Sequence, residues 1–150
     1  MKIYLPFLCV AFIATACCWG TRKCLMSENG ATFRLINAVT GEDLVFGSSR
    51  VYDKTQIKFY SLRGADTIMH QYIPGAYSNA VQDSFLFVYF GTTLPEIAYI
   101  KLNASDTDTV SLRYRIFDKD CCPDVSYLVP DKFNNKPIES ANSGIYLLKK

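Results

Sequence analysis

The chain has few of the side chains on which hydrolytic sites usually depend. Its 150 residues include one histidine, His70, and one tryptophan, Trp19. A Ser-His-Asp arrangement would need His70, and Asp66 lies near it, but no Gly-x-Ser-x-Gly motif is present to hold a nucleophile. We therefore predict a protein without catalytic activity, with no catalytic residue and no cofactor, in which His70 is structural or exposed. A small secreted enzyme is the alternative.

The sequence also lacks a strong excess of charge of either sign. It has 16 Lys and Arg against 14 Asp and Glu, a net charge of +2. Loss of residues 1–16 would remove only Lys2 from the charged set and leave +1. Domains that bind nucleic acid usually carry a basic patch or stripe. We therefore expect no nucleic-acid partner.

Long apolar runs are missing after the N-terminus. Residues 3–16 follow the single charge of Lys2, carry no charge themselves and have one polar side chain, Thr15. A charged start, a short apolar run and small residues at its end are typical of a signal peptide. A membrane-spanning helix needs about 20 apolar residues, and Gly20-Thr21-Arg22-Lys23 interrupts this run too early. The sequence therefore predicts a signal peptide over residues 1–16 and an exported protein.

The end of this segment indicates how the exported chain is held. Ile13-Ala14-Thr15-Ala16-Cys17 resembles the lipobox of bacterial lipoproteins, although Ala14 stands where leucine is usual. The resemblance covers residues 1–17 and implies that Cys17 carries a lipid, which would anchor the protein to a membrane of the cell envelope. The alternative is that an ordinary signal peptidase recognises Ala14-x-Ala16 and the protein is secreted.

The remaining cysteines suit an oxidising compartment. Cys9 leaves with the signal peptide, and if Cys17 carries lipid, four cysteines remain that can form two disulfides. We expect the first two to pair with the last two, in either order, because a bridge between adjacent cysteines strains their shared peptide. Zinc is an alternative partner for four thiolates, but adjacent cysteines are poorly spaced for it. The disulfide candidates are Cys18, Cys24, Cys121 and Cys122.

Short runs in which apolar and polar residues alternate indicate half-buried strands. Residues 84–90 are instead apolar on both faces, which predicts a central strand covered on both sides. No window of a dozen residues keeps a helical stripe. The apolar members of the alternating runs are Ile57 and Phe59; Ala98, Ile100 and Leu102; and Val110, Leu112, Tyr114 and Ile116.

Turn-rich clusters separate these runs at intervals of about ten residues, a pattern typical of an antiparallel sandwich or barrel. Residues 31–150 are therefore predicted to form one all-β domain, an antiparallel β-sandwich. Residues 17–30 are predicted to be a short tether that precedes it. The body resembles the immunoglobulin-like or transthyretin-like domains found in small exported lipoproteins, and this resemblance implies a sandwich fold.

Tyrosines are the candidate binding residues. Residues 70–79 include Tyr72 and Tyr77 and are among the least strand-like parts of the chain, so we predict a surface loop there and consider it as a ligand-binding loop. Tyrosine gives rigid contact area at low entropic cost and can stack on sugar rings. We favour the interpretation in which both side chains pack back on the domain. Tyr60 and Tyr99 are assigned to the ordinary surface of the sheet.

Two acidic pairs, Asp106 with Asp108 and Asp118 with Asp120, raise the possibility of calcium binding. The predicted strand between the pairs would hold them about 30 Å apart, at roughly 3.3 Å per residue, so they cannot share one ion. We interpret them as solvated carboxylates in turns and predict no metal site.

These features predict a lipid-anchored accessory or binding module of the cell envelope without catalytic activity. Its expected partners are the membrane, through the N-terminal lipid, and an envelope protein or a glycan. The alternative is a carbohydrate-binding module that uses exposed tyrosines.

Overall fold

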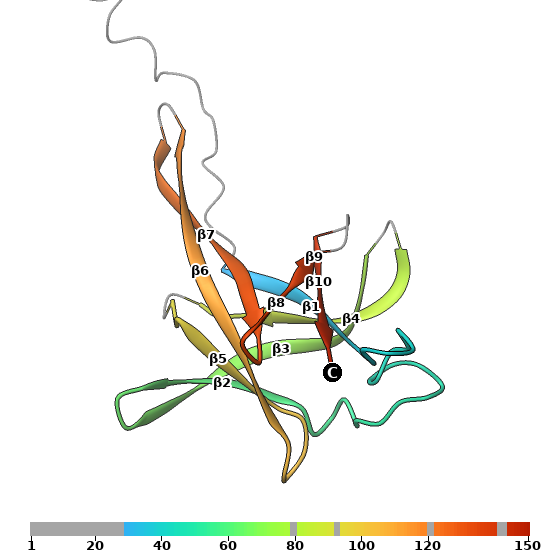
Figure 1. The fold of residues 1–150 in the computed structure, drawn as a ribbon. Helices are drawn as coiled ribbons and strands as arrows, with labels where there is room; N and C mark the ends of the chain where they lie inside the picture. The colour runs from blue at the N-terminus through green and yellow to red at the C-terminus, as the bar shows by residue number, and fades with distance from the viewer. Residues whose placement is uncertain (1–28, 79–80, 92–93, 120–121, 141–143) are drawn as a thin grey trace, which may run out of the picture.

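The computed structural model describes residues 29–78, 81–91, 94–119, 122–140 and 144–150, and within these ranges it is all-β with no helix (Figure 1). The all-β prediction is confirmed. The predicted signal peptide, Cys17, and three of the disulfide candidates lie outside these ranges. The strands are β1 (Gly30–Ile36), β2 (Lys58–Arg63), β3 (Asp66–Ser78), β4 (Val81–Tyr89), β5 (Ile97–Lys101), β6 (Thr107–Lys119), β7 (Cys122–Phe133), β8 (Lys136–Pro137), β9 (Glu139–Ser140) and β10 (Ile145–Lys149).

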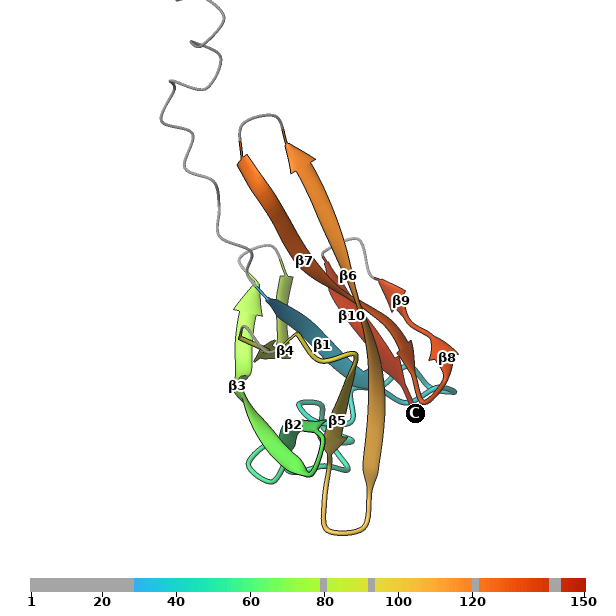
Figure 2. The ribbon, with the colours of Figure 1, turned by 90° about the vertical axis from the view of Figure 1, so that its left-hand side faces the viewer.

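The ten strands form one nearly closed sheet in the order β8-β7-β6-β5-β2-β3-β4-β1-β10-β9. The two edge strands are neighbours in the chain, because Ile138 alone separates β8 from β9. One short segment therefore pairs with β7 at one edge and with β10 at the other. Figure 2 shows the result, with β10 beside β7 across the curled sheet. Each of these edge strands is only two residues long, and very short edge strands are one way in which proteins limit pairing with other chains.

One pair of strands departs from the predicted antiparallel arrangement. β1 and β10 run parallel, with Phe33 opposite Tyr146 and Leu35 opposite Leu148. Parallel neighbours need a long connection between them, and here that connection is most of the chain. The domain also begins slightly earlier than the predicted residue 31, since β1 starts at Gly30.

Two tight hairpins follow from local turn chemistry. Gly64 and Ala65 link β2 to β3, and Gly64 has φ +61° at the first central position. Asn134 and Asn135 link β7 to β8 with φ values of +47° and +66°. Positive φ at both central positions matches the twist of two-residue hairpins, and asparagine tolerates it better than most residues.

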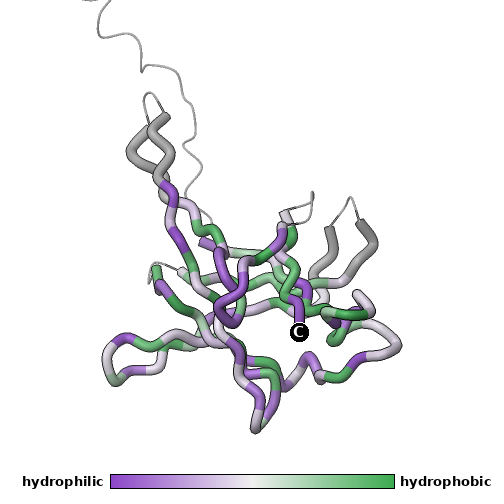
Figure 3. Tube along the Cα trace, viewed as in Figure 1, coloured by the Kyte–Doolittle hydropathy of each residue, from purple (hydrophilic) through white to green (hydrophobic). Residues whose placement is uncertain are grey.

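Alternate residues of the strands point into the curled sheet and form the core. Figure 3 shows hydrophobic and hydrophilic residues alternating along the coloured part of β6. The predicted inward positions are confirmed for Ile57 and Phe59 and for the β5 series, all of which are buried. The largest fully buried side chains include Phe33, Phe59, Phe90, Leu35, Ile57, Leu86, Ile100, Leu102 and Leu148.

The long connection between β1 and β2 contributes Leu44, Val45 and Tyr52 to this core. Asp43 shapes it: one carboxylate oxygen accepts hydrogen bonds from the amides of Val45 and Phe46, both at 2.8 Å. Its other oxygen accepts one from Arg34 Nε at 3.0 Å. The carboxylate is buried, but three donors compensate for its desolvation.

A polar cluster joins the last residue of the chain to distant segments. Lys150 Nζ donates to Asp106 Oδ1 at 2.6 Å and to Asp108 Oδ2 at 2.7 Å. The Tyr52 hydroxyl donates to the other oxygen of Asp106 at 2.7 Å, and Asn134 Nδ2 donates to Asp108 Oδ1, also at 2.7 Å. The β1–β2 connection, the start of β6, the β7–β8 turn and the end of β10 are thereby held together.

Replacing Lys150 with methionine should destabilise the fold, because buried Asp108 would lose its cation. We expect the free energy of unfolding to fall by about 2–3 kcal/mol, below the full cost of breaking a buried pair because this site is partly exposed. Lys149→Met is the matched control: it breaks an exposed pair with Glu139 and should cost at most about 0.5 kcal/mol. Urea unfolding of the two variants measures the difference, and equal losses would contradict the assignment.

Candidate functional site

The predicted ligand loop over residues 70–79 is wrong, because residues up to Ser78 belong to β3. Pro74 and Gly75, which resemble a turn in the sequence, form an irregularity within the strand: the pairing with β4 shifts between Pro74 and Ala76, and Gly75 has φ +76°. A β-bulge absorbs an extra residue in this way without ending the strand.

Tyr72 points to the core side of the sheet. Its ring packs on Phe59, with centroids 5.5 Å apart, and its hydroxyl donates a hydrogen bond to the backbone carbonyl of Lys54. Burial raises the pKa of this phenol. Tyr72 therefore packs back on the domain, and its ring is not a platform for a sugar. Tyr77 also lies on β3, but its side chain is outside the described residues.

His70 is a core residue. It is 7% exposed. Its Nε2 atom lies 2.9 Å from the hydroxyl of Ser61, and its ring packs edge-on against Phe90. Burial lowers the pKa of His70 below 6.5, which keeps the imidazole neutral at pH 7. Because Ser61 is buried as well, the pair is not placed to meet a substrate.

The other predicted site residues do not assemble into a described centre. Asp106 and Asp108 hold the Lys150 ammonium, whose hydrogen bond is the main cause that lowers the pKa of Asp106. Cys122 begins β7 at the far end of the β6–β7 hairpin, while its proposed partners Cys18 and Cys24 are outside the described residues. In the part of the chain that the structure describes, no three His, Cys, Asp or Glu side chains gather as a metal site would require.

The most distinctive surface is the outward side of β2, β3, β4 and β5, where large apolar side chains are exposed. Met69 and Ile73 are each 57% exposed, and Tyr89 is 46% exposed. We call this surface the outer face. Its members are Tyr60, Leu62, Met69, Ile73, Tyr89, Ile97 and Tyr99.

Strand register explains why these residues meet. Tyr60 lies opposite Met69 on β3 and opposite Tyr99 on β5, so three side chains form a row across three strands. The rings of Tyr60 and Tyr99 stack with centroids 5.1 Å apart and planes 13° apart. Leu62 and Ile97, two residues along their strands, line one shallow hollow of about 320 Å³ with Tyr99. The outer face is therefore continuous over β2 and β5.

β4 explains the other half of the outer face. The sequence predicts a central strand that is covered on both faces. β4 is central, because β3 and β1 pair with its two edges. Its inward residues Leu86 and Val88 are buried, but Tyr89 is exposed and Phe87 only half-buried. The prediction of a central strand is confirmed, and two-sided cover holds at Phe85, which is 7% exposed, but not at Tyr89. Phe87 lies over Gly30, where an added Cβ would come within 2.7 Å of the ring.

A pair of lysines borders the stacked tyrosines. Lys58 and Lys101 lie directly opposite each other on β2 and β5, in the row next to Tyr60 and Tyr99, and both are exposed. The ammonium group of neither lysine makes an ion pair or a hydrogen bond with another described residue. Like charges directly opposite on a sheet are unfavourable, so the pair adds nothing to the stability of the isolated sheet.

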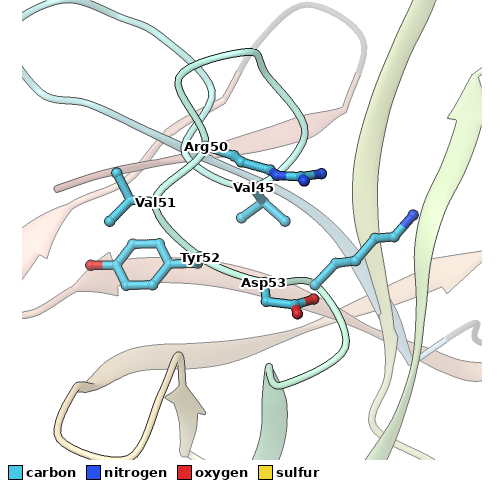
Figure 4. Close-up of a pocket in the computed structure, with 6 residues that line it drawn as sticks. Val45, Arg50, Val51, Tyr52 and Asp53 are labelled. Carbon is cyan, nitrogen blue, oxygen red and sulfur yellow. The ribbon is translucent and has the colours of Figure 1, made fainter.

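A second hollow, of about 260 Å³, lies on the β1–β2 connection (Figure 4). Val45, Val51 and Tyr52 form its apolar part, and the charged ends of Arg50 and Asp53 lie at its side. Hydrogen bonds from Thr55 are the main cause that lowers the pKa of Asp53, which is fully exposed. The hollow gathers no buried polar group that points into it, and we assign it no function.

Comparisons with known proteins do not identify the chain: no protein-family model, curated protein or solved structure matches it. The described residues also include no helix that is long and apolar enough to span a membrane. Sequence reasoning missed the outer face because Tyr60 and Tyr99 occupy ordinary strand positions. The available signal for the outer face was that the strand over residues 84–90 carries apolar residues on both of its faces.

His70 should make stability depend on pH below 6.5. Its pKa is lowered in the folded state, so the unfolded chain takes up a proton first as the pH falls. Stability is fully present above pH 6.5 and declines below it, with a slope of at most about 1.4 kcal/mol per pH unit. The chain has one histidine. In the His70→Gln variant, the urea midpoint should therefore change less with pH between pH 6.5 and 5 than it does in the wild type. An unchanged slope in that variant would contradict the assignment.

Proposed function

We propose that this chain is an exported, lipid-anchored binding module of the cell envelope, without catalytic activity, and that it contacts its partner through the outer face. The observation that carries the proposal is the row across β2, β3 and β5, in which exposed Met69 adjoins the half-buried, stacked Tyr60 and Tyr99, with exposed Leu62 and Ile97 beside them. Contiguous apolar surface of this kind is rare on monomeric proteins and often marks an interaction site.

The polar groups of the described chain support binding rather than catalysis. Ser61 and His70 face each other in the core, and Asp108 is held by Lys150 and Asn134. A nucleophile or general base has to reach its substrate. The outer face instead offers tyrosine, methionine and aliphatic side chains, which suit contact with a surface.

Within the all-β fold we propose a two-layer sandwich of the immunoglobulin-like or transthyretin-like kind. The contacts of β1 and β10 with β7 support it, because they bring distant parts of the sheet to face each other. Side chains of Phe33 and Leu148 meet Leu128 in a single core cluster.

The lipid anchor is supported by residues 13–17, and intact mass spectrometry tests it. Protein purified from its native envelope should have the mass of residues 17–150 plus lipid. Without reduction it should lack four protons and take up no alkyl label, because two disulfides are proposed. An unlipidated chain that starts at Cys17 would refute the anchor and point to a secreted protein.

Photocrosslinking tests the outer face as the contact surface. A photoreactive amino acid at position 69 in the native host should give an adduct with an envelope component. The matched control is position 39, since Val39 is 93% exposed but lies on the β1–β2 connection, away from the outer face. Adducts at position 39 alone, or at neither position in correctly located protein, would contradict the proposal.

A further inference from the structure

We propose that the outer face lies against an anionic lipid surface, so that the membrane which holds the anchor is also the partner of the folded domain. This inference rests on the proposed lipid anchor. It names the bilayer, rather than a protein or a glycan, as the occupant of the outer face.

Charge is the first argument. Lys58 and Lys101 form a like-charged pair at the border of the apolar surface, and their side chains have no partner among the described residues. The described carboxylate nearest to this surface is Glu96, which lines the hollow with Leu62 and Ile97, at the other end of the β2–β5 pairing from the two lysines. The lysine pair is therefore unfavourable alone but complementary to a surface of negative charge, where each basic side chain gains attraction.

The accompanying side chains are the second argument. Tyr60 and Tyr99 present an apolar ring with a polar hydroxyl, a combination that suits the boundary between water and lipid. Leu62, Ile97 and Met69 can enter the apolar side of that boundary. Lysine reaches past such residues with its ammonium in the headgroup layer. The outer face thus has both components of an interfacial binding surface.

The position of the tether is the third argument. The 12 residues between Cys17 and Gly30 can span at most about 40 Å even when fully extended, so a lipid on Cys17 would keep the domain close to the headgroups. The chain enters the fold at Gly30, which lies directly opposite Tyr89 on β4. The tether therefore joins the domain at the margin of the outer face, and the anchor raises the local concentration of lipid there.

The geometry argues against two other occupants. The rings of Tyr60 and Tyr99 stack on each other at 5.1 Å, so one face of each ring is already covered and is closed to a sugar. A second copy of the chain offers the two lysines of the outer face one described carboxylate, Glu96. Each of these occupants has its own outcome in the test.

The test is hydroxyl-radical footprinting of the full protein, purified from its host and reconstituted in vesicles. The vesicles contain phosphatidylcholine with or without phosphatidylglycerol. Oxidation of Met69, Tyr60 and Tyr99 should fall several-fold in the anionic vesicles, while Val39 stays unchanged. High salt should restore the oxidation, because it screens the lysines.

Charge reversal makes the test specific. Lys58→Glu with Lys101→Glu should abolish the protection, since the two lysines together favour the bound orientation by about thirtyfold. Lys54→Glu with Lys136→Glu changes the net charge equally, uses exposed lysines outside the outer face and should leave the protection intact. Matching urea midpoints for both double variants establish that the fold is retained.

Three outcomes would overturn the inference. The first is equal oxidation of Met69 in both kinds of vesicle. The second is protection that is already present in detergent, which would indicate a second copy, and the third is protection that requires added envelope polysaccharide. Failure of the anchor is distinguishable, because intact mass reports it directly. If the chain is unlipidated, its flotation with anionic but not neutral vesicles still supports the inference, and its absence from both overturns it.

Discussion

The ammonium of Lys150 is the contact on which the closed form of the sheet depends. It lies between Asp106 and Asp108, and through them it is linked to Tyr52 and Asn134. Burial alone would lower the pKa of Lys150, but its hydrogen bonds to the two carboxylates raise it overall, so it stays charged. The carboxylates and the ammonium therefore compensate for one another's loss of water. Removing the ammonium would leave two carboxylates, one of them buried, without a cation at the end of the sheet.

Closure of the sheet determines which surfaces remain for interaction. The segment around Ile138 joins both edges, and the β1–β2 connection places Leu44 and Val45 in the core. With the interior filled, the outward sides of the strands are the main surface that the described chain offers. Most of that surface is polar or charged, as on β6, where Arg113 pairs with Asp131. The outer face differs because its apolar residues lie opposite one another on adjacent strands.

Local patterns in the sequence were sufficient to predict the strands and their buried sides, as at Ile57 and Phe59, because alternation is a property of neighbouring residues. They were insufficient for features that join distant residues. The parallel pairing of β1 with β10 and the contact of Lys150 with Asp106 depend on how the whole sheet curls. The Pro74-Gly75 pair was misleading for a different reason: a bulge and a turn use the same residue types, and only pairing with β4 distinguishes them.

The described polar groups fall into two sets, and the difference between them bears on function. Asp43, Ser61, His70 and Asp108 are buried, and each has a hydrogen-bond partner within the fold. These groups stabilise the fold through their hydrogen bonds, so we expect substitutions of them to lower the free energy of unfolding. Lys58 and Lys101 stabilise little in the isolated domain, and their repulsion opposes it. Residues that a fold keeps exposed at some cost in stability are explained more simply by a partner of opposite charge than by the fold itself.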